Sequence, residues 1–580
     1  MVRSIPAASF SLILIVVSLG AQTPSPAATV MTRLADDYVA AITERDPEGA
    51  TFVGLPNARN DRVFDNSPAA QQAWDRRVDE FVKRLQTIDS IALAGRPEAV
   101  TYGFLKQELD AETGSRACRF EKWGVNQLFG WQTRIPGRLL RQPIATAADR
   151  AAALTRLRQY PKFIDQEIAN LRDGLKDKYS APQGNVDRVI AQIDALKSGE
   201  AAESPFASFA KESQDATFRR DVAAVVASDL NPALERYRRF LGEYRGVARA
   251  DVGVSAQPQG DACYRALVGT YTTLPLTADD VHQTGLTLMD QIHTEMQVIA
   301  ERRFNTTDVT AALQRVRSDP ALRFTTSAEI RAKASDAIAR AKSAVPRYFG
   351  RLPKADVILQ PFPDFEAAGT PPPQYRDPSL DGSRPGLYMI NLLNPQQTST
   401  VDLEGITFHE SIPGHHLQIA LAQEQRGAHL LTQISGSTAL IEGWGLYAER
   451  LADEMALYSS DLDRFGMLSL QAWRAARLVV DTGIHSRKWT RQQAIDYMLK
   501  NTATAEPLVQ SEVDRYIIMP GQALAYMIGE REIMKQRDKA QAALGSRFDI
   551  RAFHDTVLGR GAVTLPMLRE QVETWIAAQR

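Results

Sequence analysis

Apolar residues recur at steps of three and four along much of this chain, and this spacing constrains its fold more than any other feature. The pattern is clear over residues 28–38, 73–89 and 147–171, where charged residues fill the positions between. Such a period places the apolar side chains on one face of an α-helix. The chain therefore predicts a mostly α fold.

Polar residues at the expected helix starts support this interpretation. Thr277 is typical of the N-cap of a long helix, which we expect to continue through residue 300. Thr326 with Glu329, and Thr490 with Gln493, have the spacing of capping boxes. In that motif the two side chains satisfy backbone N–H groups that the first helical turn leaves free. These positions predict three well-defined helix starts.

Two Pro- and Gly-rich connections interrupt the helical pattern. They span residues 252–260 and 361–385, and we expect the second to run over the surface. It leads into residues 386–391 (GLYMIN), the best strand candidate because they are short and aromatic between turn residues. The predicted organisation is an N-terminal helical region, residues 22–260, and a C-terminal helical region, residues 261–580, which holds the chemistry.

Composition excludes several classes of protein. The 580 residues are 44% hydrophobic and 24% charged, which is typical of a folded globular chain and not of a disordered or collagen-like one. Basic and acidic residues number 68 and 69, for a net charge of −1. This balance gives no electrostatic reason to expect a nucleic-acid partner or an acidic membrane surface. It leaves the oligomeric state open.

The N-terminus has the pattern of an export signal. Arg3 precedes an apolar run at residues 10–19, which is too short to span a bilayer as a stable helix. The small residues Gly20 and Ala21 follow, as a signal peptidase requires. We predict a cleavable signal peptide over residues 1–21, the alternative being an uncleaved anchor.

Export determines the predicted compartment. No later stretch reaches 18 apolar residues, so we expect the mature protein to be periplasmic or secreted, without stable membrane insertion. No cysteine stands at the cleavage site, which argues against a lipid anchor. The only two cysteines, Cys118 and Cys263, form either a disulfide in that oxidising compartment or a pair of buried thiols.

Three of the eight histidines stand within a short segment that also carries an acid: His409, Glu410, His415 and His416. Two histidines four residues apart on a helix can share a zinc ion, while a glutamate beside the first activates water. Here the position four residues after His409 is Pro413, which cannot bind a metal. The familiar spacing is therefore broken.

A break in the helix can restore the geometry. In an unbroken helix His415 would face about 120° away from His409, and His416 would lie about 10.5 Å further along the axis. Pro413 cannot continue the hydrogen-bond ladder, and Gly414 permits unusual dihedral angles. Together they can loop out about two residues, which favours His415 as the second ligand, with His416 as the reserve. The competing interpretation is that the helix simply ends and the histidines lie on the surface.

A third ligand is expected downstream. Glu442 lies 27 residues after His415 in a helical pattern, a plausible distance for a second helix to pack against the first. Gly443 and Gly445 each cost helix stability, which suggests that another backbone approaches closely there. Glu449 is seven residues after Glu442, hence on the same face, and could accept a hydrogen bond from a ligand imidazole. Two solvated glutamates remain the alternative.

One later helix combines an apolar surface with a single polar stripe. The stripe falls within an arc of about 80° and consists of Arg474, Arg477, Asp481 and His485. Asp481 could orient His485 as a hydrogen-bond donor to a developing oxyanion, and an arginine could hold a substrate carboxylate. A structural salt-bridge network would explain the stripe equally well.

A second Pro-Gly pair near the C-terminus follows Arg515 and Tyr516 and precedes Tyr526. Either tyrosine could donate a hydrogen bond to an oxyanion in a site that excludes water. Tyrosines packed in the core are the alternative.

These motifs together resemble the bacterial family catalogued as domain of unknown function 885. The resemblance rests on the His409–His416 segment with Gln418, on the segment from Glu442 to Glu449, and on residues 271–276, 386–391, 474–489 and 515–529. It implies a large helical, zincin-like metallopeptidase architecture with a small β element before the metal-binding helix, in a secreted or lipoprotein-like protein. It also implies His409, His415 and Glu442 as zinc ligands and Glu410 as the base.

The leading hypothesis is an exported zinc-dependent hydrolase, a peptidase or other amidohydrolase with one Zn²⁺. We expect a peptide or other amide substrate to add as a strand along residues 386–391, near Tyr388 and Asn391. One alternative is a non-haem iron or manganese oxygenase, which also uses two histidines and a carboxylate. Another is an inactive metal- or peptide-binding protein. Exo- and endopeptidase action are not distinguished.

Overall fold

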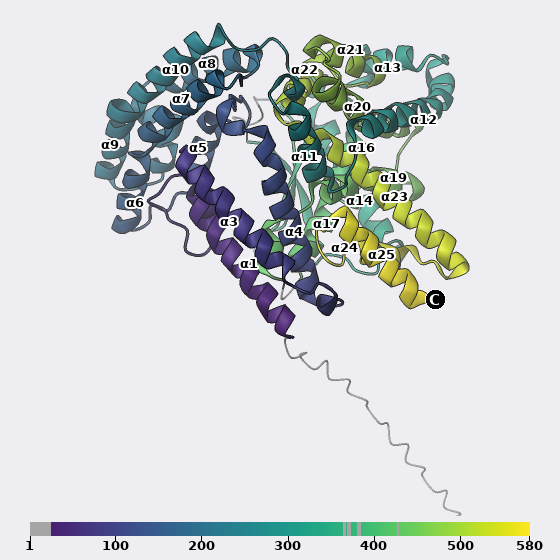
Figure 1. Ribbon diagram of the computed structural model, residues 1–580. Helices are drawn as coiled ribbons and strands as arrows, with labels where there is room; N and C mark the ends of the chain where they lie inside the picture. Colours follow the sequence, from purple (N-terminus) through teal and green to yellow (C-terminus); the bar gives the residue numbers. More distant parts are fainter. Residues whose placement is uncertain (1–24, 364–366, 368–372, 380–383, 426–427) are drawn as a thin grey trace, which may run out of the picture.

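The computed structural model describes residues 25–363, 367, 373–379, 384–425 and 428–580. Helices dominate it, and one three-stranded sheet is present among these residues, so the predicted mostly α class is confirmed (Figure 1). The predicted signal peptide, residues 1–21, lies outside the described residues. No described helix is both long and apolar enough to cross a membrane.

The N-terminal helices form the left side of the molecule in Figure 1, where α1, α3 and α4 lie together below and α6 to α10 lie above. Their bounds are α1 Pro26–Arg45, α2 Pro47–Val53, α3 Pro68–Gln86, α4 Pro97–Ser115, α5 Trp131–Leu139, α6 Ala147–Leu157, α7 Tyr160–Lys176, α8 Gln183–Lys197, α9 Ala216–Val225 and α10 Asn231–Arg245.

Most of the remaining helices form the right side of the molecule in Figure 1, whereas the short α18 packs against α1 and α4. The first group is α11 Gly260–Thr272, α12 Ala278–Phe304, α13 Val309–Ser318 and α14 Ser327–Ala344. After the sheet come α16 Leu403–Glu410, α17 His415–Gln423, α18 Leu430–Ile434, α19 Thr438–Glu454, α20 Asp461–Ser486, α21 Arg491–Asn501, α22 Glu506–Ile518, α23 Ala525–Leu544, α24 Ile550–Leu558 and α25 Leu565–Gln579.

Local sequence signals set several of these boundaries. Thr277 caps α12, and the two predicted capping boxes begin α14 and α21, as expected. The single periodic segment over residues 147–171 forms two helices, α6 and α7, which corrects the sequence pattern. Pro161 stands in the first turn of α7, and a proline there cannot continue a preceding helix because it lacks the N–H and its ring clashes with the carbonyl four residues back.

The sheet contains β1 (Val357–Pro361), β2 (Gln374–Arg376) and β3 (Gly386–Ile390) in the order β1-β3-β2. The predicted strand is therefore present, but β2 occurs inside the connection that we expected to be a surface loop. Because β3 pairs with β1 in parallel and with β2 antiparallel, both of its edges are occupied. The prediction that a substrate adds along residues 386–391 is wrong for this reason.

Buried side chains gather in one large core and smaller clusters. The large core unites α12, α19, α20 and α23 with the sheet, and two others lie among the N-terminal helices. Cys118 and Cys263 form a disulfide, with Cα atoms 4.6 Å apart, which joins the two predicted regions. The domain boundary near residue 260 stays a prediction. Helix α12 packs along α20 and α23 packs along α19, and α16 contacts both α19 and α20. The side chains described next lie mainly on α16, α17, α19 and α20.

Candidate metal centre

The Pro-Gly segment separates two helices and folds the chain back tightly. Helix α16 ends at Glu410 and α17 begins at His415. The Gly414 N–H donates to the Phe408 carbonyl at 3.0 Å. A Cβ on Gly414 would lie only 1.9 Å from the His409 carbonyl oxygen, so only glycine fits this close approach. The break therefore does what the sequence predicts, since it brings the two helices' histidines to one place.

The side chains of His409, His415 and Glu442 converge. The two imidazole rings have centroids 4.7 Å apart at an angle of 85°. One Glu442 oxygen lies 3.8 Å from His409 Nε2 and 3.5 Å from His415 Nε2. Tetrahedral zinc with bonds of about 2.0–2.1 Å separates its ligand atoms by about 3.3–3.4 Å. The donor set and its spacing therefore fit one zinc ion.

The glycines around Glu442 permit this packing. A Cβ on Gly445 would lie 2.7 Å from the His409 ring, and one on Gly443 would lie 2.5 Å from the Gly529 Cα. The close backbone approach predicted from the two glycines is confirmed, because α23 crosses α19 at Gly443. The imidazole of His409 can lie against α19 only because position 445 has no side chain.

A buried carboxylate orients the first imidazole. His409 Nδ1 donates to Glu449 at 2.8 Å, which leaves Nε2 facing Glu442. Burial lowers the pKa of His409, but hydrogen bonds to Glu442 and Glu449 outweigh burial and raise it to about 9. For Glu442, burial raises the pKa, but the two histidines hold it well below its ordinary value. Glu442 therefore stays an anion, which a cation ligand requires.

Glu410 lies beside these groups and is held separately. One potential ligand atom from each of His409, Glu410 and His415 lies within 4.8 Å of the others. The Tyr375 N–H in β2 donates to Glu410 Oε2 at 2.9 Å, which fixes one carboxylate oxygen and leaves the other. Since Glu442 is the carboxylate within ion-pair distance of both Nε2 atoms, Glu442 suits the ligand position and Glu410 a neighbouring one.

His416 faces away from this cluster. Its Nε2 donates to the Ala355 carbonyl at 3.1 Å, and its Nδ1 accepts from the Tyr375 hydroxyl at 2.9 Å. Both ring nitrogens are thus used, and burial lowers the pKa of His416 to about 4. Sequence reasoning missed Tyr375, which contacts both Glu410 and His416. Tyr375 lies in β2, inside the Pro- and Gly-rich connection, whose composition did not predict a strand.

Two other predicted substrate contacts make internal hydrogen bonds. The Tyr388 hydroxyl bonds to Thr407 Oγ1 at 3.1 Å, and Tyr388 is fully buried. The Asn391 side chain donates to the Ala367 carbonyl. The first contact joins β3 to α16, and the second joins the residue after β3 to the segment before β2.

The polar stripe of α20 forms a buried network. Asp481 accepts from the Tyr264 hydroxyl at 2.6 Å and from the Gly521 N–H. His485 accepts from the Val254 N–H through Nδ1 and donates to the Tyr516 carbonyl through Nε2. Backbone groups rather than Asp481 therefore orient His485, which corrects the predicted pairing. With no exposed surface and both nitrogens used, His485 has no N–H to offer an oxyanion.

The buried state of His485 predicts an acid-dependent loss of stability. Burial lowers the pKa of His485 to about 3 from an ordinary value near 6.5, so the unfolded chain binds more protons between these values. The stabilisation is complete above pH 6.5 and is lost as the pH falls toward 3, at about 1.4 kcal/mol per pKa unit. His485→Gln keeps a donor and an acceptor but does not titrate, so its free energy of unfolding should fall less steeply. Equal slopes in denaturant titrations of both proteins would contradict this expectation.

Arg474 and Arg477, the other members of the stripe, point to different acids. Arg474 is buried, with a nitrogen 3.7 Å from Glu449, the carboxylate that orients His409. Arg477 instead donates to Glu512 at 2.8 Å, and Arg515 donates to the same carboxylate. Sequence reasoning missed Glu512, although its position three residues before Arg515 on α22 is a recognisable ion-pair spacing.

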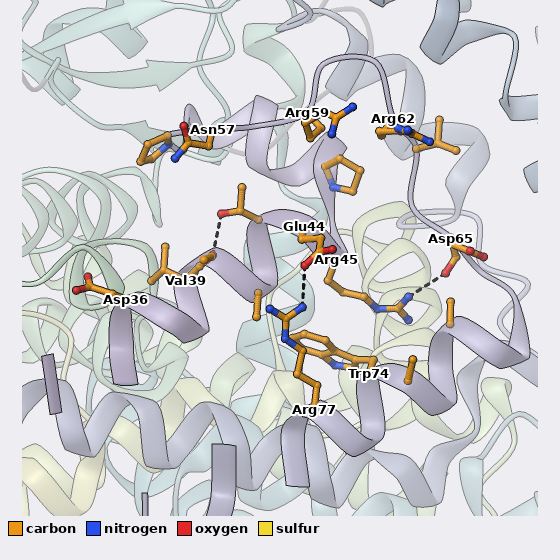
Figure 2. Close-up of a pocket in the computed structure, with 18 of the residues that line it drawn as sticks. Asp36, Val39, Glu44, Arg45, Asn57, Arg59, Arg62, Asp65, Trp74 and Arg77 are labelled. Atoms are coloured by element: carbon orange, nitrogen blue, oxygen red, sulfur yellow. Dashed lines mark hydrogen bonds and ion pairs between the residues drawn. The ribbon is translucent and has the colours of Figure 1, made fainter. Parts of the chain in front are cut away.

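The cavity drawn in Figure 2 is lined by residues other than those of the metal-type cluster. It measures about 730 Å³ and is bordered by α1, α2, α3 and the segment that joins α2 to α3. Its charged side chains are paired, for example Arg77 with Glu44 at 2.8 Å and Arg45 with the Asp65 carbonyl at 2.9 Å (Figure 2). No member of the metal-type cluster is among its lining residues, so we do not assign the chemistry to it.

Fold and site thus define a large helical protein with a His–His–Glu cluster beside a further glutamate. The chain belongs to the family described as bacterial protein of unknown function (DUF885), whose model matches residues 47–572. A comparison with curated proteins finds no match.

Two solved structures are similar over nearly the whole chain. One is a protein of Colwellia psychrerythraea described as a putative lipoprotein, with 27% identity, a TM-score of 0.85 and coverage of 96% of this chain and 100% of that one. The other is a protein of Shewanella oneidensis described as a putative lipoprotein of unknown function. It has 16% identity, a TM-score of 0.78 and coverage of 93% of this chain and 99% of that one, and it supports the fold alone.

Proposed function

We propose that the chain is an exported zinc-dependent hydrolase that cleaves peptide or related amide bonds. The observation that carries the proposal is the convergence of His409 Nε2, His415 Nε2 and a Glu442 oxygen, with Glu410 beside them. Two imidazoles and one carboxylate leave a coordination position for water or substrate in a catalytic zinc site. The similar protein of Colwellia psychrerythraea is described as a putative lipoprotein, which supports export.

The chain's own residues have distinct roles in this proposal. His409, His415 and Glu442 would hold the ion, which would lower the pKa of bound water toward about 7 and polarise the scissile carbonyl. Glu410, fixed by the Tyr375 N–H, accepts the proton of the attacking water and then donates it to the leaving amine. Glu449 holds the His409 ring in the orientation that binding requires.

The oxygenase alternative uses the same three ligands but no adjacent base. A 2-His-1-carboxylate iron site has open positions for oxygen and co-substrate and gives a second glutamate at Glu410 no special use. The position of Glu410 therefore favours hydrolysis over oxygen chemistry.

A digest of a peptide library tests the proposal. We expect the mature protein to cleave library members, the activity to disappear after treatment with a chelator, and added Zn²⁺ to restore it. Mass spectrometry of the products measures all three arms. Cleavage that a chelator leaves unchanged, or an intact library under every condition, would exclude a zinc-dependent peptidase.

A further inference from the structure

Arg477 has a buried guanidinium N–H group without a hydrogen-bond partner among the described residues, and the rings of Trp473 and Tyr526 flank the guanidinium carbon at 4.7 and 4.5 Å. Its Nε donates to the Tyr516 hydroxyl at 2.8 Å and its Nη2 donates to Glu512 at 2.8 Å. Its Nη1 is buried and makes no hydrogen bond within the described part of the chain. Water cannot replace the missing partner easily, because the residue is only 4% exposed. A buried charged donor that lacks an acceptor is costly, so this group is a candidate for contact with a ligand.

The charges around Arg477 do not balance. Arg515 donates to both Glu512 oxygens, at 2.9 and 2.8 Å, so two guanidinium groups share one carboxylate. The cluster of Arg477, Arg515 and Glu512 therefore carries one net positive charge. Asp481, an acid on the same helix as Arg477, is bonded to Tyr264 and Gly521 instead. Buried charge without a counter-ion is unfavourable, and one bound anion would neutralise the cluster.

This cluster adjoins the proposed metal centre through Tyr526. The α19–α23 crossing lies at Gly443 and Gly529. Glu442 directly precedes the first of these glycines, and Tyr526 lies about one turn before the second. The Arg477 guanidinium carbon lies 4.5 Å from the centre of the Tyr526 ring.

On the basis of the proposed hydrolase function, we infer that Arg477 and Arg515 bind the C-terminal carboxylate of a peptide substrate. A carboxylate carries the single negative charge that the cluster lacks, and its planar pair of oxygens matches the donor fork of a guanidinium. Arg515 and Tyr526 are less deeply buried than Arg477, which gives the anion a route of approach. The site then fixes the end of the chain, so cleavage occurs close to the C-terminus and the protein is an exopeptidase.

The test compares two N-terminally labelled peptide pools that differ only at the C-terminus, one of free acids and one of amides. Wild-type protein should cleave the free acids with a kcat/KM about 10- to 100-fold higher, in keeping with the loss of one or two charge-assisted hydrogen bonds. Mass spectrometry should place the cuts at a constant number of residues from the C-terminus. Because the readout is a ratio within one protein preparation, partial misfolding of a variant does not imitate the result.

Variants identify the group responsible. Arg477→Gln should reduce the acid-to-amide ratio toward one, and Arg477→Lys should keep part of it because the charge remains. The control is Arg491→Gln on α21, which removes an arginine whose hydrogen bonds go to Asp514 on α22 rather than to Glu512. Its ratio should equal that of the wild-type protein. An unchanged ratio in Arg477→Gln would overturn the assignment.

The remaining outcomes separate this inference from the hydrolase proposal. Equal cleavage of both pools would overturn the carboxylate site and leave the hydrolase proposal intact. If neither pool is cleaved, the hydrolase proposal fails, and fluorescence anisotropy of Glu410→Gln with the same two pools decides the binding question. Tighter binding of the free acids, weakened by an added Arg477→Gln change, supports the site, and equal affinities overturn it.

Discussion

Replacing Glu410 by Gln should abolish peptide hydrolysis while leaving the metal in place. The amide has the shape of the carboxylate and can still accept from the Tyr375 N–H, but it cannot take a proton from water. A positioned general base typically contributes about 10²–10⁴-fold, so we expect kcat/KM to fall by at least about 100-fold. Product formation from a labelled peptide and metal content by mass spectrometry measure the two parts of the prediction.

A matched control is Glu424→Gln. Glu424 is the C-cap residue of α17, the helix that begins with His415, and its carboxylate accepts from the Lys354 N–H. The Glu424→Gln variant should keep both peptide hydrolysis and the bound metal. Normal turnover by Glu410→Gln would remove Glu410 from the mechanism, and loss of its metal would show that Glu410 is a ligand rather than a base.

The neighbouring histidines 415 and 416 should respond oppositely to replacement by alanine. His415→Ala removes one of three ligand atoms, so we expect zinc affinity to fall by several orders of magnitude and hydrolysis to disappear. His416→Ala removes only the contacts with Ala355 and Tyr375, so zinc should remain bound. Because the two histidines are adjacent, both replacements should disturb the tight Pro-Gly segment to a similar extent, and each variant serves as the control for the other.

Competition with a zinc-binding dye measures the two dissociation constants, and far-UV circular dichroism verifies that both variants are folded. Similar zinc affinities in the two proteins would contradict the ligand assignment. Loss of zinc from His416→Ala alone would transfer the second ligand position to that residue.

Features that depend on a few adjacent residues were predictable from the sequence. The capping boxes at Thr326 and Thr490 are of this kind, because a cap involves groups within one helical turn. The turn at Pro413 and Gly414 is another, since a proline and a glycine act on the backbone where they stand. The convergence of His409 and His415 follows from that local turn.

Features that depend on which distant segment packs against a residue were not predictable. The stripe on α20 was assigned to one helix face correctly, but the residues that cover it come from elsewhere: Tyr264 reaches Asp481, and Val254 reaches His485. Helical phase fixes the direction of a side chain and says nothing about its partner. For the same reason the loop-like composition around β2, which pairs with β3 through three residues, does not predict a strand. Without β2 the sequence predicts that one edge of β3 is open.

The most direct test of the central claim is the metal content of protein purified without added metal. The account predicts one zinc per chain in the wild-type protein and in His416→Ala, and little or none in His415→Ala, because the fold gathers His409, His415 and Glu442 around one site. The account would be contradicted if the wild-type protein contained no transition metal. It would also be contradicted if the His415→Ala and His416→Ala variants contained equal amounts of zinc.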